Sequence, residues 1–131
     1  MHFFGTNFAF LTYWLIGGLF MESLKMKSFK DLSEMVILIA DRFFVARRIQ
    51  TTQDLDYLAE FDLGDADAYA QYTEKVTKAF DSLNDAEKNL INNEFFFQGY
   101  HNWWESIYSK STFYRHKREA MKKFLGAFYH A

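Results

Sequence analysis

The chain has 131 residues, of which 50% are hydrophobic and 21% aromatic, and its net charge at pH 7 is −2. This length suits one compact domain rather than two, and so high an apolar content excludes general disorder. The sequence contains no cysteine, which excludes disulfides, thiolate zinc sites and cysteine nucleophiles. It also contains no proline, and this favours helices. We therefore expect an all-α fold.

The charge is distributed unevenly along the chain. Residues 1–97 contain 9 Lys and Arg against 15 Asp and Glu, a balance of −6, whereas residues 98–131 contain 6 against 2, a balance of +4. A basic end on an acidic body predicts that this end meets a polyanion.

Residues 1–27 form an apolar N-terminal segment. The uncharged run from Phe3 to Phe20 is almost long enough to cross a bilayer, but Gly, Thr and Asn interrupt it and no basic region precedes it. Three interpretations stay open: a buried helix, an extension ahead of a start at Met21, and a membrane segment. We do not count a membrane among the expected partners, and we expect a cytoplasmic protein.

Residues 28–82 form an acidic helical part. Apolar residues recur every three or four positions from about Ser28 to Gln50 and predict a helix, with Ser28 or Asp31 as its N-cap. An acidic turn follows over residues 62–67. A second amphipathic helix, Tyr69 to Leu83, is expected to pack on the first.

Residues 83–131 carry the clearest signals. Asn84 and Glu87 form a capping-box pattern that predicts a helix of about 14 residues ending at Gly99. The interval from Tyr100 to Tyr108 leaves room for a short helix, and Ser109 then caps a long basic helix. This succession predicts a C-terminal helix-turn-helix, whose last helix presents its first turns to the major groove of DNA.

The last predicted helix has two faces. Its core face contains Phe113, Ala120, Met121 and Phe124. Lys and Arg neutralise phosphates or contact guanine, and Ser and Tyr hydroxyls donate hydrogen bonds. We therefore expect the DNA contacts to be made by the residues of the polar face, with Arg118 contacting the DNA backbone: Lys110, Ser111, Tyr114, Arg115 and Arg118.

Together these residues resemble a known family. Leu83 to Lys88 (LNDAEK), the Gly99 turn, Trp103 to Glu105 (WWE) and Tyr108 to Arg115 (YSKSTFYR) are similar to the helix-turn-helix of sigma-70 region 4, in the version found in small phage-type, ArpU-like regulators. The pattern's apolar and small positions match at Ser109, Thr112, Phe113, Ala120 and Met121. The chain departs from it at Trp103, Ile107 and Lys117. The resemblance implies a DNA-binding transcription regulator that contacts RNA polymerase or itself.

No catalytic or cofactor motif is present in the sequence, so we expect neither an enzyme nor a cofactor. His101 and Glu105 are four residues apart, but two ligands alone make a weak metal site, and no metal is expected. The expected partner is double-stranded DNA, with RNA polymerase and a homodimer as open possibilities. The alternative is a protein-interaction module on the same scaffold that does not bind DNA.

Overall fold

The computed structural model describes residues 24–60, 66–97 and 99–130. Within these ranges all regular structure is helical, which confirms the all-α prediction for them. The run from Phe3 to Phe20 lies outside the described residues, and none of the described helices is both long and apolar enough to span a membrane. The named helices are α2 (Phe29–Thr51), α3 (Leu55–Leu58), α4 (Ala66–Asp81), α5 (Asp85–Ile91), the π-helix η2 (Asn92–Phe96) and α6 (Lys110–His130).

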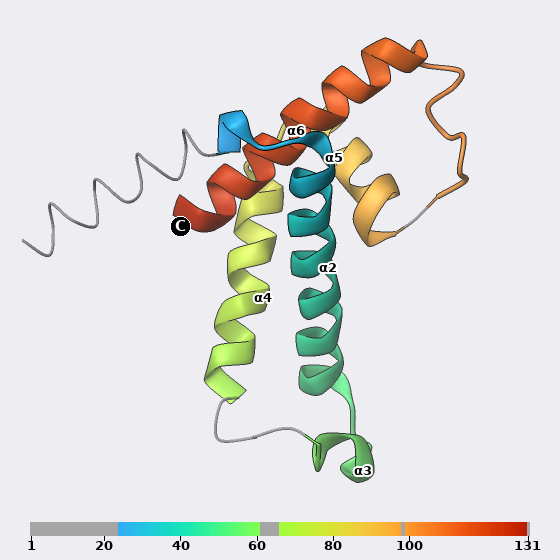
Figure 1. Ribbon diagram of the computed structural model, residues 1–131. Helices are drawn as coiled ribbons and strands as arrows, with labels where there is room; N and C mark the ends of the chain where they lie inside the picture. The colour runs from blue at the N-terminus through green and yellow to red at the C-terminus, as the bar shows by residue number, and fades with distance from the viewer. Residues whose placement is uncertain (1–23, 61–65, 98, 131) are drawn as a thin grey trace, which may run out of the picture.

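Two long helices and a third that crosses them make up the body of the molecule. Helices α2 and α4 lie side by side, as the sequence predicts, and α6 passes over the start of α2 and the end of α4 (Figure 1). Helix α5 packs on α6. The first turns of α6 project beyond the α2–α4 pair (Figure 1).

Side-chain caps fix the start of α2 and of α3. The Ser28 hydroxyl accepts a hydrogen bond from the Asp31 backbone N–H at 3.1 Å, so Ser28 rather than Asp31 is the cap of α2. A carboxylate oxygen of Asp54 accepts hydrogen bonds from the backbone N–H groups of Asp56 and Tyr57 and caps the single turn of α3. These caps satisfy donors that the helices themselves leave unpaired.

The predicted capping box of α5 is confirmed. Asn84 accepts from the Glu87 N–H at 2.8 Å, and the Glu87 carboxylate accepts from the Asn84 N–H at 3.0 Å. The helix then widens into η2, where the Phe97 N–H donates to the Asn92 carbonyl at 2.8 Å. Regular helix therefore ends at Phe96, slightly before the predicted stop at Gly99.

Gly99 has a different role from the one expected. No described residue has a positive φ, so Gly99 is not a left-handed cap of the kind common at helix ends. Instead it allows a close approach, because a Cβ at this position would lie 2.5 Å from Oδ1 of Asn93.

One core joins all the long helices. On α6, the four residues predicted to face the core are buried, and they pack with apolar residues of α2, α4 and α5. Phe96 of η2 lies in an aromatic cluster, with ring centroids 5.6 to 6.2 Å from those of Phe43, Phe44, Phe80 and Phe124. The end of α5 is thereby fixed against both α2 and α6.

Candidate nucleic-acid interface

The first two turns of α6 point outward. Ser109 caps the helix: its hydroxyl lies 3.4 Å from the Thr112 N–H and donates to the Thr112 hydroxyl at 2.9 Å. Four of the five predicted DNA-contact residues follow directly and are exposed to solvent: Lys110, Ser111, Tyr114 and Arg115.

The two cations of these turns, Lys110 and Arg115, are exposed to solvent. Within the described ranges, neither Lys110 nor Arg115 forms a hydrogen bond or an ion pair. Tyr114 is 42% exposed, and one side of its ring meets the Phe29 ring edge-on, with centroids 5.5 Å apart. The leading end of α6 therefore offers two free positive charges beside a partly fixed aromatic ring.

The short helix expected between Tyr100 and Tyr108 is not formed. The segment folds as successive turns, with bonds such as Trp103 N–H to Tyr100 O at 3.1 Å and Ile107 N–H to Trp104 O at 2.9 Å. A segment this short needs favourable local residues to offset the cost of starting a helix, as the Asp54 cap supplies for the still shorter α3. Asn, Ser and aromatic residues, all weak helix formers, make up most of the segment from Tyr100 to Tyr108. The last helix of the predicted helix-turn-helix is present, but the helix expected to brace it is replaced by turns.

Two tryptophans of this turn segment brace α6. The Trp104 ring stacks on the Phe113 ring, with centroids 4.4 Å apart and planes at 6°. The Trp103 ring meets the same Phe113 ring edge-on, with centroids 5.9 Å apart and planes at 84°. Phe113 itself is 1% exposed, so both indoles tie the turn segment to a side chain in the core. Trp103 is partly buried and packs against the core.

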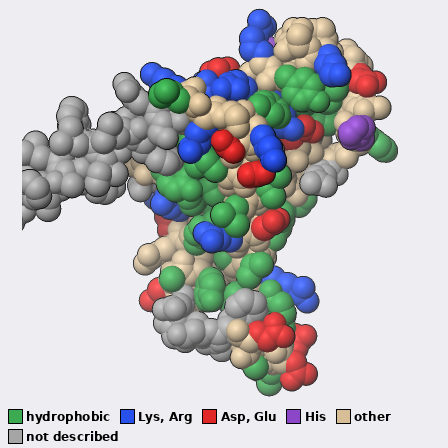
Figure 2. Space-filling model, in the orientation of Figure 1, with side chains coloured by type: hydrophobic (Ala, Val, Ile, Leu, Met, Phe, Trp, Pro, Cys, Tyr) green, Lys and Arg blue, Asp and Glu red, His purple; other side chains and the backbone are tan. Residues whose placement is uncertain are grey.

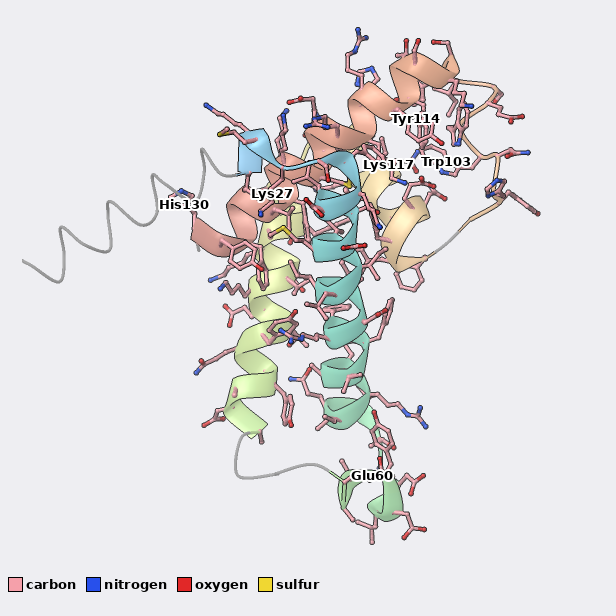
Figure 3. The ribbon with its side chains drawn as sticks, in the orientation of Figure 1. Lys27, Glu60, Trp103, Tyr114, Lys117 and His130 are labelled. Atoms are coloured by element: carbon pink, nitrogen blue, oxygen red, sulfur yellow. The ribbon has the colours of Figure 1, made fainter. Side chains whose placement is uncertain are left out.

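A polar cluster closes the same junction. Glu94 of η2 accepts from Nζ of Lys117 at 2.7 Å and from Nε1 of Trp103 at 3.0 Å. Figure 3 labels Lys117 and Trp103 at this junction. The side chains of Lys117 and Glu94 are only 15% and 17% exposed. Lys117, which stands where the resembled pattern has an apolar residue, is thus accommodated by an acid from the preceding helix.

Arg118 is the fifth predicted contact, and it differs from the other four. It is half-buried, and its Nη2 donates to the backbone carbonyl of Lys27 at 2.8 Å. The guanidinium retains further N–H donors beyond this bond. Arg118 therefore joins α6 to the chain just ahead of α2.

That contact brings lysines from the acidic part of the sequence to the basic helix. Lys25 and Lys30 are exposed and Lys27 is half-buried. Lys and Arg side chains gather over α6 and the beginning of α2 (Figure 2). The net negative charge of residues 1–97 masks this local basic cluster. The sequence does contain a signal for it, because three lysines lie within six positions: Lys25, Lys27 and Lys30.

Lys123, late in α6, is occupied by an acid. Its Nζ lies 2.6 Å from a carboxylate oxygen of Glu87. Burial acts to raise the pKa of Glu87, but the hydrogen bonds from Lys123 and from the Asn84 N–H outweigh it and lower that pKa. The same hydrogen bond raises the pKa of Lys123. This lysine holds α5 against α6.

The structure gathers no metal cluster in the part of the chain that it describes, where no three His, Asp or Glu side chains lie together. His101 and Glu105 are both exposed on the turn segment.

Comparisons with models of protein families, with curated proteins and with solved structures find no match to this chain.

Proposed function

We propose that the protein is a cytoplasmic, sequence-specific DNA-binding transcription regulator, related in its mode of binding to sigma region 4. In this proposal the first turns of α6 enter the major groove. Four residues contact bases or phosphates: Lys110, Ser111, Tyr114 and Arg115. Arg118 contacts the DNA backbone through the guanidinium N–H groups that its bond to the Lys27 carbonyl does not use. The turn segment takes the place of the bracing helix.

One observation carries this proposal: Lys110 and Arg115 stand exposed, and unpaired within the described ranges, on a helix end that is held rigidly from behind. Unpaired cations break no existing ion pair when they meet phosphates or guanine edges, and a helix backbone that is already fixed loses little further freedom on binding. The helix N-terminus adds backbone N–H donors to the same surface. A helix end with this charge and support suits a polyanion better than an apolar partner.

The test is duplex binding by fluorescence anisotropy over salt concentrations of about 50 to 200 mM. The wild type should bind a mixed-sequence duplex with a falling log-log salt dependence. Lys110→Ala and Arg115→Ala should each weaken binding, whereas Lys78→Ala, which removes an exposed charge from α4, should not. Unchanged binding in both α6 variants would refute the proposed mode of binding.

A protein-interaction module is the second candidate, and exposed apolar side chains on α2 favour it. Ile37, Leu38, Phe44 and Val45 are each 39% to 49% exposed. Such a strip suits RNA polymerase or a second copy of the chain. Two results together would support this function over the first. The wild type would bind neither heparin nor duplex DNA at low salt, and its association with the polymerase or with itself would be lost in Phe44→Glu.

A further inference from the structure

The chain from Leu24 to Phe29 runs along α6 in the opposite direction. The Phe29 ring contacts that of Tyr114, and the Lys27 carbonyl binds Arg118. Lys25 lines a cavity of about 660 Å³ together with Lys122. Each step of two residues toward the N-terminus thus corresponds to one turn of α6.

This arrangement places basic residues on two adjoining tracks. One track is on α6 and contains Arg115, Arg118 and Lys122, which recur at helical spacing and so share one side of the helix. The other track contains Lys25, Lys27 and Lys30, ahead of and within the first turn of α2. Between Arg115 and Lys122 the α6 track extends over about 10 Å.

The acids of this surface leave an excess of positive charge. Lys30 lies 4.0 Å from Glu34 in a pair whose members are 84% and 63% exposed, and Lys122 lies 3.6 Å from Glu119. The exposed Lys30–Glu34 pair is weak and readily exchanged, whereas the Lys122 side chain is only 23% exposed and the Glu119 side chain 57%. Among the described residues, and counting Asp31 as well, three acids accompany the six cations of the two tracks.

We propose that Lys25, Lys27 and Lys30, together with Lys122, form a phosphate-binding band that grips the DNA backbone beside the groove entered by the first turns of α6. This inference rests on the proposed function and assigns it a second set of contacts. The band binds phosphates of any sequence, whereas the leading turns of α6 read bases. Arg118 is also a positioning residue, because its bond to the Lys27 carbonyl holds the lysine track beside α6.

DNA is a suitable occupant because it carries one negative charge per about 1.7 Å of helix axis. A band that runs beside an α6 track about 10 Å long therefore faces several phosphates. The lysine side chains need no fixed geometry to contribute, since a flexible ammonium acts as a point charge toward phosphate, but the backbone that carries them must lie beside α6.

The test compares salt dependence in the full chain. Lys25→Gln/Lys27→Gln/Lys30→Gln removes one track, and each lost phosphate contact should reduce the log-log slope by about 0.9. We expect a reduction of up to about 2.7 and an affinity loss of about tenfold or more, the same on two duplexes of unrelated sequence. Circular dichroism and thermal unfolding verify that the variant stays folded.

The matched control removes the same number of charges from α2 itself. The control variant is Arg42→Gln/Arg47→Gln/Arg48→Gln. These arginines lie roughly 20 Å along α2 from Lys30, beyond the screening length, so the variant should leave the salt slope unchanged. A lysine variant with the wild-type slope, or a control that lowers the slope equally, would overturn the band while leaving the proposed function standing. A wild type that binds neither duplex would overturn both.

The positioning role of Arg118 has a separate readout. In Arg118→Lys the charge is kept but the planar donor set is lost, so the lysine track should become less ordered. We expect faster amide hydrogen exchange at Lys27 and Ser28 and a smaller salt slope. Unchanged exchange at these amides would exclude the role.

Discussion

Lys117 and Glu94 form an ion pair at 2.7 Å between α6 and η2, at the position where the resembled helix-turn-helix pattern has an apolar residue. Both side chains are largely buried, so each charge depends on the other. Glu94 also accepts from Trp103. The pair thus connects the three segments that determine where α6 points.

Removing one member of this pair should be more harmful than replacing both. Glu94→Ala leaves a buried ammonium and an unpaired indole N–H, and should lower the free energy of unfolding by about 3 kcal/mol. Glu94→Gln/Lys117→Met keeps an acceptor for Trp103 and should lie within about 1 kcal/mol of the wild type. Urea denaturation of the three proteins measures this. A double variant less stable than Glu94→Ala would contradict the explanation.

Trp104 should contribute to stability through its stacking on Phe113. Trp104→Ala removes the stacked ring and opens the Phe113 side chain, which is only 1% exposed in the wild type, to solvent. The free energy of unfolding should therefore fall by about 3 kcal/mol. Tyr100→Ala, in the same segment but 89% exposed, is the control and should change little. Equal effects of the two substitutions would show that the turn segment does not brace α6.

Local signals in the sequence predicted the starts of α2, α5 and α6 correctly. Ser28 and Asn84 each begin a helix because a short polar side chain followed by an amphipathic run determines a helix start within a few residues. The apolar spacing of α6 likewise predicted its buried side, including Phe113 and Met121. These features depend on neighbours along the chain, which the sequence shows directly.

Features that depend on contacts between distant segments were missed. The two tryptophans of the turn segment contact Phe113 and Glu94, which belong to other elements. The contact of Arg118 with Lys27 joins residues 91 positions apart, and no local pattern indicates it. Four of the five predicted DNA contacts are exposed, but their binding to DNA stays a prediction.

The effect of Gly99→Ala on stability should depend on which side chain stands at position 93: destabilising beside Asn93, stabilising beside alanine. In the wild type the new Cβ would displace the Asn93 side chain, whose Nδ2 donates to the Asn89 carbonyl at 2.8 Å, and should cost up to about 1 kcal/mol. In an Asn93→Ala background the obstacle is gone. Because the φ of Gly99 is not positive, alanine should then stabilise by about 0.5 kcal/mol.

A double-mutant cycle measured by thermal unfolding checks this prediction. The coupling between positions 93 and 99 should be about 1 kcal/mol or more. Additive effects of the two substitutions would show that Gly99 is not selected by the approach of Asn93.

The stability of the α5–α6 contact should depend on pH through Glu87 and Lys123. The pKa of Glu87 is lowered in the folded chain from its ordinary value of 4.5. Its contribution is therefore present above that value and is lost as the pH falls through the folded pKa. The pKa of Lys123 is raised above 10.5, so its contribution is present below that value and is lost as the pH rises through the folded pKa.

Glu87→Gln should therefore be less stable than the wild type at neutral pH, and the difference should shrink as the pH falls below about 4. The glutamine keeps an acceptor for the Asn84 N–H, so the cap survives and the comparison isolates the charge. Asp85→Asn, a neighbouring substitution in the same helix turn, controls for the general loss of acid charge, and its deficit should be smaller. Urea denaturation at several pH values measures both. A deficit in Glu87→Gln that stays constant or grows on acidification would mean that the carboxylate is not stabilised by Lys123 in the folded protein.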